Sequence, residues 1–171
     1  MPRQLVVVTG PIASGKTTVA FRLAALARER GARAAAIDID LVVEMIMGKD
    51  WARVSVAREI TSGIAETLFA DGVEFVFVAG TSLSYGERDQ LLRGFAIQPP
   101  AIFVLLRVSL EESIQRAQAD PERVSTKDPA VVAKHYERIH WDEVPQQDID
   151  IDTDGLSLDE VVAAVAEQVL G

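Results

Sequence analysis

The sequence predicts an α/β fold in which a five-stranded parallel sheet carries helices on both faces. Strand-like and helix-like segments alternate five times along the chain, which is typical of such sheets. The first strand-like segment, residues 5–8, is an unbroken apolar run, as expected for a strand buried on both faces. A chain of 171 residues is long enough for one hydrophobic core, and we expect a single domain over residues 1–171.

The strands are short apolar runs that end in loops. The second is rich in alanine and leads into Asp38-Ile39-Asp40, and the fifth alternates aspartate with isoleucine, which indicates one wetter face. We expect the five strands at residues 5–8, 33–38, 73–79, 102–106 and 149–153.

Seven segments have apolar residues at the spacing of an amphipathic helix. Gly31 is placed to end the first helix and Pro129 to begin the sixth. Ser109 and Ser157, each with a glutamate three residues later, predict capping boxes for the fifth and seventh. We expect these helices at residues 17–30, 41–47, 51–70, 85–95, 109–119, 129–141 and 157–170. The polar residues 120–128 are expected to form a mobile flap, a short lid.

The composition narrows the class of protein. A formal net charge of −9 argues against sequence-independent binding to nucleic acid or anionic lipid, which needs clustered Lys and Arg. Without cysteine the chain has no disulfides, zinc–thiolate sites or iron–sulfur clusters. The sequence shows neither a signal peptide nor an apolar run of the roughly 20 residues that a membrane helix needs. We therefore expect a cytoplasmic protein with no nucleic-acid, membrane or obligate protein partner.

Residues 10–17 match the phosphate-loop pattern G-x-x-x-x-G-K-[ST] at each fixed position. The glycines let the backbone N–H groups form an anion-binding nest, and the N-terminus of the next helix adds its dipole. We expect Lys16 to reach the terminal phosphates as a catalytic residue and the Thr17 hydroxyl to ligate Mg²⁺. The alternative is a chance glycine turn, but a buried strand and an amphipathic helix flank the pattern as this loop requires. The expected ATP-binding residues here are Gly10, Pro11, Ile12, Ala13, Ser14, Gly15, Lys16, Thr17 and Thr18.

Two aspartates follow the second strand, at the edge of a parallel sheet where ligands bind. We expect an extended chain across Asp38 and Asp40, with one carboxylate facing a metal and the other facing an acceptor hydroxyl. Phosphoryl transfer to an alcohol needs a group that orients the hydroxyl and accepts its proton. We expect Asp38 to bind metal and Asp40 to act in catalysis. The alternative is that both are solvated loop acids, or that Asp40 caps a helix beginning at Leu41.

Two arginines follow the fourth strand. Arg123 lies in the predicted flap, from which a guanidinium can close onto the transferring phosphoryl group and exclude water. Arg116 lies on the preceding helix and can stack on a nucleobase. Ordinary surface charge is the alternative for both. The third strand ends without the Walker B acid of motor ATPases and GTPases, so we expect metal binding to fall to Thr17 and Asp38.

Together these residues resemble the small P-loop kinases, a group that includes shikimate kinase, gluconate kinase, adenylylsulfate kinase, chloramphenicol phosphotransferase and the zeta-toxin-like kinases. The resemblance spans nearly the whole chain in element order. It implies a three-layer P-loop NTPase sandwich with strand order 2-3-1-4-5. The sequence Gly80-Thr81-Ser82 stands where shikimate kinase has a Gly-Gly-Gly run, so shikimate is not the expected acceptor.

The resemblance also implies residue roles. Asp38 would be metal-associated and Asp40 would contact the acceptor hydroxyl. Arg116 would stack on adenine, Arg123 would be a lid arginine, and the turn that carries Asp154 and Leu156 would border adenine.

The acceptor pocket is expected between the helix of Asp40, the helix at residues 51–70 and the loop after the third strand. Arg58 suits a carboxylate or phosphate because a guanidinium binds planar anions in bidentate fashion; an exposed helix arginine is the alternative. His135 and His140 lack the spacing and third ligand of a zinc site, and we expect polar residues that touch substrate only if their helix folds over the site. The candidate lining residues are Asp40, Arg53, Arg58, Thr81, Ser82 and Tyr85.

The sequence therefore predicts an enzyme, an ATP- and Mg²⁺-dependent kinase that moves the γ-phosphate to a hydroxyl of a small-molecule acceptor. Two alternatives stay open. One is a nucleoside or nucleotide kinase, in which Tyr85 or Trp51 would stack on the acceptor base. The other is a non-catalytic ATP-binding regulatory module.

Overall fold

The computed structural model describes residues 3–47, 54–121 and 125–171. No helix in these ranges is both long and apolar enough to cross a lipid bilayer.

Five parallel strands form one sheet in the predicted order β2-β3-β1-β4-β5. Leu5 and Val7 of the central strand pack into the core on one face, whereas Val6 and Val8 pack into the core on the other. This two-sided burial is why residues 5–8 of the first strand are all apolar. The strands are β1 (Gln4–Thr9), β2 (Ala34–Asp38), β3 (Phe75–Ala79), β4 (Ala101–Arg107) and β5 (Ile149–Asp152).

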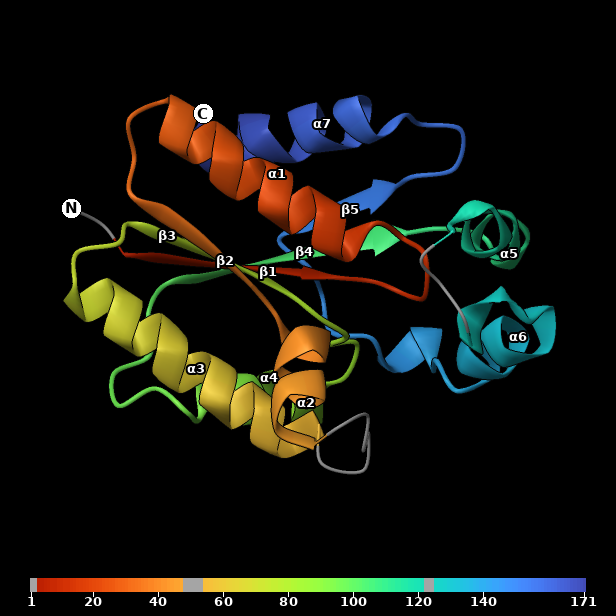
Figure 1. Ribbon diagram of the computed structural model, residues 1–171, viewed down its shortest axis with the longest axis horizontal. Coiled ribbons are helices and arrows are strands. Elements are labelled where there is room, and N and C mark those ends of the chain that lie inside the picture. The colour runs from red at the N-terminus through yellow and green to blue at the C-terminus, as the bar shows by residue number, and fades with distance from the viewer. Residues whose placement is uncertain (1–2, 48–53, 122–124) are drawn as a thin grey trace.

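Helices cover both faces of the sheet, which confirms the predicted three-layer sandwich (Figure 1). One face carries α1 (Lys16–Glu29) and α7 (Leu158–Leu170). The other carries α2 (Ile39–Met47), α3 (Val54–Ala70) and α4 (Tyr85–Leu92).

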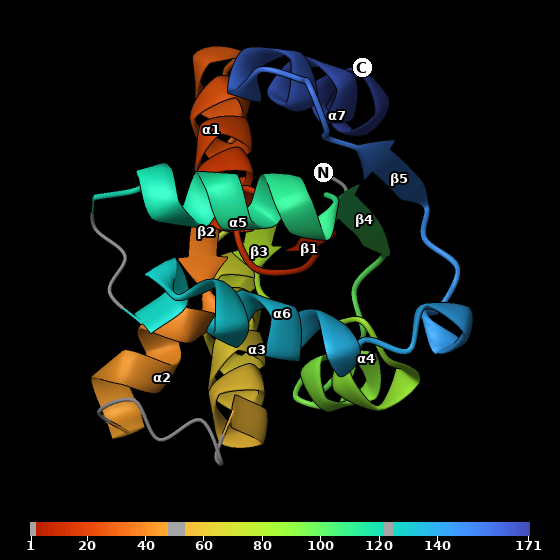
Figure 2. The same cartoon turned by 90° about the vertical axis from the view of Figure 1, so that its right-hand side faces the viewer.

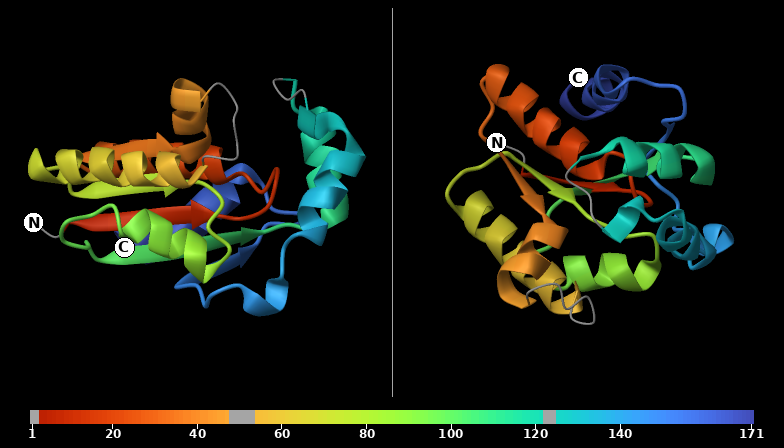
Figure 3. Two further views of the ribbon diagram at one scale, coloured as in Figure 1. Left: turned by 90° about the horizontal axis from the view of Figure 1, so that it is seen from below. Right: turned by 45° about the vertical axis from the view of Figure 1, so that its right-hand side comes forward.

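Two further helices, α5 (Leu110–Ala119) and α6 (Pro129–Glu137), lie beyond the carboxyl ends of the strands. Figure 2, viewed from that end, shows both helices crossing in front of the sheet, and Figure 3 shows them grouped at one end of the molecule. A small apolar cluster of Ala13, Ala117 and Val132 joins these helices to the phosphate loop. The Ser113 hydroxyl also donates to the Ile12 carbonyl over 2.7 Å. The phosphate loop therefore packs against α5 and α6 at the carboxyl ends of the strands.

Three described helix boundaries differ from the prediction by two residues or more. The second helix begins at Ile39, two residues earlier than predicted, because Asp38 caps its first turn by accepting the N–H of Asp40 over 2.8 Å. Ile39 itself is 1% exposed and packs in the core. The fourth helix ends at Leu92, three residues early, before Gly94. The sixth ends at Glu137, where the Arg138 N–H donates to the His135 carbonyl in a tighter turn.

Two short 3-10 turns were not predicted. One, Ser125–Lys127, lies in the expected flap, and the other, Trp141–Glu143, replaces the end of the predicted sixth helix. The predicted start of the third helix, residues 51–53, lies outside the described residues.

Candidate active site

The phosphate loop joins β1 to α1, and its backbone has the shape of an anion-binding nest. Ala13 and Gly15 adopt left-handed φ values of 58° and 92°, which are typical of such nests. A side chain at Gly10 would collide with the Leu106 carbonyl oxygen and with Ser14, so the glycine is required for close packing. The helix α1 begins at Lys16, so its positive dipole end lies at the loop.

Lys16 folds back over the loop that carries it. Its ammonium donates to the Pro11 carbonyl over 2.8 Å, and the residue lines the cleft described below. The Lys16 ammonium is therefore a cation held at the phosphate loop, on the wall of that cleft.

Asp38 connects the loop to the second strand. Its Oδ2 accepts a hydrogen bond from the Thr17 hydroxyl over 2.6 Å, and the side chain is almost fully buried, at 7% exposure. Its Oδ1 accepts the N–H of Asp40, as described above. The expectation of an extended chain across the two aspartates is wrong, because Asp40 lies in the first turn of α2. The alternative in which Asp40 caps the helix is also wrong, because Asp38 is the cap.

Asp40 opens onto the cleft, in contrast to Asp38. Protein atoms crowd this carboxyl and reduce its hydration, which raises its pKa. The nearby Lys16 ammonium opposes this rise, and the Asp38 carboxylate adds to it. Part of the Asp40 side chain stays exposed to solvent, and its carboxyl holds a proton more readily than an ordinary aspartate does.

A central cleft of about 510 Å³ brings most of the predicted site together. Of the predicted residues it is lined by Ile12, Ala13, Gly15, Lys16, Thr17, Thr18, Asp40, Arg58 and Thr81. His135 also lines the cleft, as expected if its helix folds over the site. Sequence reasoning missed the other lining residues, Ile39, Val54, Glu87, Thr126 and Val131. Glu87 had a signal in the sequence, since it stands three residues after Ser84 in a capping box that the structure contains.

Other predicted residues lie elsewhere. Ser82 is 0% exposed, and its backbone N–H donates to the Thr9 hydroxyl below the cleft. Tyr85 is 68% exposed and does not line the cleft. Arg53, Arg123 and Trp51 lie outside the described residues. Within the described chain the cleft is lined by no Phe, Tyr or Trp side chain.

Arg58 is a buried residue with an engaged guanidinium, at 4% exposure. Its Nη2 donates to the Thr81 carbonyl over 2.9 Å and forms an ion pair with Glu87 Oε1 at 2.8 Å. Its Nη1 donates to Gln90 over 2.8 Å. The alternative of an exposed helix arginine is therefore wrong, and the guanidinium joins α3 to the loop and helix that follow β3.

Arg116 and Leu156 line a smaller pocket of about 220 Å³ beside the phosphate loop, together with Ser14, Gly15 and Thr18. The Arg116 guanidinium is fixed there, because it donates to the hydroxyl and carbonyl of Thr153 over 3.0 and 2.7 Å and to Glu112 over 2.9 Å. The capping box predicted for this helix is incomplete, because the Glu112 side chain pairs with Arg116 instead of accepting the N–H of Ser109. The Asp154 carboxylate accepts that N–H over 3.0 Å. This backbone hydrogen bond lowers the pKa of Asp154.

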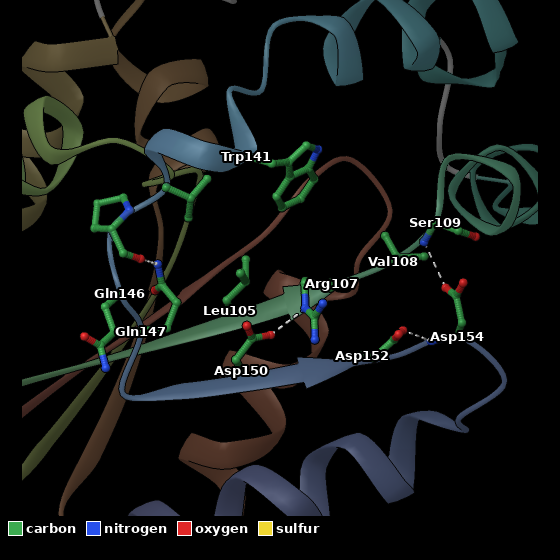
Figure 4. Close-up of a pocket in the computed structure, with 12 residues that line it drawn as sticks. Leu105, Arg107, Val108, Ser109, Trp141, Gln146, Gln147, Asp150, Asp152 and Asp154 are labelled. Atoms are coloured by element: carbon green, nitrogen blue, oxygen red, sulfur yellow. Dashed lines mark hydrogen bonds and ion pairs between the residues drawn. The ribbon is translucent and has the colours of Figure 1, made fainter.

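Asp154 faces a different pocket, at the edge of the sheet beside β4 and β5 (Figure 4). This pocket is larger, about 630 Å³, and contains Trp141 and an ion pair of 2.7 Å between Arg107 and Asp150. Asp152 and Asp154 add two more carboxylates, which would repel a polyphosphate. The central cleft, which contains the phosphate loop, is therefore the candidate active site despite its smaller volume.

His135 on α6 stands between the central cleft and an adjoining cavity of about 360 Å³. Its Nε2 is buried and has no hydrogen-bond partner among the described residues. Burial lowers the pKa of His135, and the nearby Lys16 ammonium lowers it further. The helix has thus folded over the site, and it presents a neutral imidazole there at neutral pH.

No protein-family model and no curated protein matches the sequence. Several solved kinase structures do match the fold over almost the whole chain. The APS kinase of Mycobacterium tuberculosis in complex with AMPPNP and APS is 23% identical, with 100% of each chain covered and a TM-score of 0.73. A sugar kinase from Janibacter sp. HTCC2649 is 17% identical, with 99% of this chain and 95% of that chain covered and a TM-score of 0.66.

The shikimate kinase of Acinetobacter baumannii in complex with shikimate is 18% identical, with 99% of this chain and 94% of that chain covered and a TM-score of 0.57. The chain has the fold of the P-loop small-molecule kinases. At these identities the likeness concerns the fold, and the roles of individual side chains depend on the geometry above.

Proposed function

We propose that this protein is an ATP-dependent kinase that transfers the γ-phosphoryl group to a hydroxyl of a small molecule. The observation that carries the proposal is the shared cleft of about 510 Å³, in which the phosphate loop and Lys16 face the same space as Asp40. A nucleotide held by the loop places its terminal phosphate near a carboxylate that can orient an alcohol. The kinase structures with the same fold, one of them with AMPPNP and APS, support this reading.

In the proposed reaction the acceptor oxygen attacks the γ-phosphorus of ATP and the bond to the β,γ-bridging oxygen breaks, so that ADP leaves. Asp40 orients the acceptor hydroxyl and takes its proton, a task that its raised pKa favours. Lys16 and the loop amides stabilise the negative charge of the phosphates. Arg116 and Leu156 border the pocket that we assign to adenine, beside the loop.

Oxygen ligands suited to Mg²⁺ stand next to the loop. The Thr17 hydroxyl and the Asp38 carboxylate already lie 2.6 Å apart, and both are hard donors. No group of three or more His, Asp or Glu side chains forms a metal site within the described residues, so we assign the remaining positions to phosphate oxygens and water. A bound Mg²⁺ would supply charge neutralisation at the phosphates.

The proposed lid, residues 120–128, would close over this cleft. Thr126, in the described part of that segment, already lines it. We keep Arg123 as a proposed lid arginine and Arg53 as a proposed acceptor contact. The cytoplasm is the proposed compartment.

Replacement of Lys16 tests the function. Lys16→Ala should lower acceptor-dependent ADP release by on the order of 10²–10³-fold, as the loss of one preorganised charge does. Lys134→Ala removes an exposed lysine of α6 and serves as the control. An unchanged rate in Lys16→Ala would contradict the proposal. The screen for acceptors should compare sugars, cyclitols, amino-alcohols and nucleosides.

A further inference from the structure

The acceptor side of the central cleft contains a buried cation that is already neutralised. Arg58 lines the cleft, but its guanidinium is bonded to Glu87, Thr81 and Gln90 at 2.8–2.9 Å. The one nitrogen without a partner among the described residues, Nε, is itself buried. An incoming anion would have to break existing bonds to reach this charge.

Glu87 is held in place through both of its carboxylate oxygens. One oxygen pairs with Arg58, and the other accepts the N–H groups of Leu83 and Ser84 over 2.9 and 3.1 Å in the capping box of α4. The side chain remains 28% exposed, and it lines both the cleft and the adjoining cavity. A fixed carboxylate therefore faces the space where an acceptor would lie.

Among residues 3–47, 54–121 and 125–171, the charges that remain on the acceptor side of the cleft are negative, and Arg53, the proposed acceptor contact, lies outside these ranges. Its charged lining residues are Lys16, Asp40, Arg58 and Glu87. In the proposed function Lys16 serves the phosphates. The Arg58–Glu87 pair turns its carboxylate to the cleft, because the Glu87 side chain is 28% exposed and that of Arg58 only 5%. The carboxylates of Asp40 and Glu87 and the neutral imidazole of His135 therefore line this space.

We propose that the acceptor is an uncharged or cationic polyhydroxy compound, of the amino-alcohol or amino-cyclitol kind, and that Glu87 discriminates against anionic acceptors. This inference rests on the proposed kinase function. Hydroxyl and ammonium groups would donate to the carboxylates of Asp40 and Glu87. A carboxylate or phosphate on the acceptor would meet like charges, while the only described cation on that side is engaged.

The test is a comparison of two ring polyols of opposite charge. We would measure the binding of 2-deoxystreptamine and of quinate by calorimetry, in the presence of magnesium and AMPPNP, with myo-inositol as the uncharged reference. The wild-type protein should bind 2-deoxystreptamine at least about tenfold more tightly than quinate, since like-charge contacts are costly. Glu87→Gln should reduce that ratio by about tenfold, because it frees the charge of Arg58 for the anion and removes the carboxylate.

Glu160→Gln is the matched control. Glu160 occupies the same capping-box position in α7 that Glu87 occupies in α4, with the same serine contacts, but it lines none of the pockets described here. It should leave the binding ratio unchanged. Equal binding of the two probes, including no binding of either, or a ratio that Glu87→Gln does not alter, would overturn the inference.

Phosphate transfer separates this inference from the function on which it rests. If the binding ratio is as expected but labelled ATP gives no phosphate to any hydroxyl compound, the kinase proposal fails and the charge preference stands. If quinate is phosphorylated as readily as 2-deoxystreptamine, the kinase proposal stands and the charge preference fails.

Discussion

At the scale of single residues, Asp40 combines a cost in stability with the proposed role in proton transfer. Crowding by protein raises its pKa, so the folded state disfavours the charged form that neutral pH imposes. Asp38, two residues earlier, is instead buried and bonded through both oxygens. The pair illustrates how the same residue type is a buried cap and proposed metal ligand in one position and the proposed proton acceptor in the other.

Asp40→Asn separates these two effects. The neutral amide removes the unfavourable charge, so we expect a higher midpoint of thermal unfolding at pH 7. It cannot take a proton from the acceptor, so the transfer rate should fall by about 10²–10⁴-fold. Asp89→Asn, an exposed change on α4, is the control for both measurements. Lower stability together with normal turnover would contradict the role of Asp40.

At the scale of elements, a buried ion pair connects α3 to the segment that follows β3. Arg58 reaches from α3 to the Thr81 carbonyl, to Glu87 and to Gln90, and its side chain is 5% exposed. Removing one partner of such a pair leaves buried polar groups without bonds.

Arg58→Met should therefore destabilise the protein by about 3 kcal/mol, measured by denaturant unfolding. Adding Glu87→Gln to that variant should recover part of the loss, because the stranded carboxylate is then neutral. Arg22→Met, which removes an exposed pair with Asp159, should cost no more than about 1 kcal/mol. A loss in Arg58→Met as small as that in Arg22→Met would show that the link contributes little.

The sequence predicted elements better than it predicted their ends. The apolar pattern of a helix or strand is set by all the residues on its buried face, so the sequence predicted the five strands and the α-helices. The start of α2 depends on Asp38 acting as a cap, and the end of α6 depends on a tight turn at Arg138. Each depends on a single local hydrogen bond, which the sequence pattern does not reveal. The phosphate loop was predictable because its backbone geometry demands particular residues at fixed spacing.

The acceptor side was predicted less well. Arg58 was expected to bind a ligand, but its guanidinium is paired with Glu87, 29 residues later in the sequence. That contact depends on how α3 packs against α4, which no local pattern encodes. Tyr85 was expected in the pocket and is exposed, because the direction of a helix-terminal side chain follows from the same packing.

At the scale of the whole molecule, the proposed binding of a polyphosphate by a chain with a net charge of −9 depends on positive groups that are local. Lys16 and the N-terminus of α1 meet at one end of the sheet, where α5 and α6 close off the strand ends (Figure 2). The same cover brings His135 into the cleft beside Lys16, where a protonated imidazole is unfavourable. The free energy of unfolding therefore depends on the protonation of His135.

The sign of that linkage predicts how acid affects the protein. The folded state binds a proton at His135 less readily than the unfolded chain, whose histidine titrates near the ordinary value of 6.5. The unfolded state therefore gains protons first as the pH falls, and the free energy of unfolding should decrease below about pH 6.5. His135→Gln should lose less stability than the wild type between pH 7.5 and pH 5.5, in denaturant unfolding at each pH. Asp40, whose raised pKa acts in the opposite direction, is present in both proteins, so the difference between them isolates the histidine. Parallel pH profiles for the two proteins would mean that His135 takes up its proton as freely in the folded state as in the unfolded one.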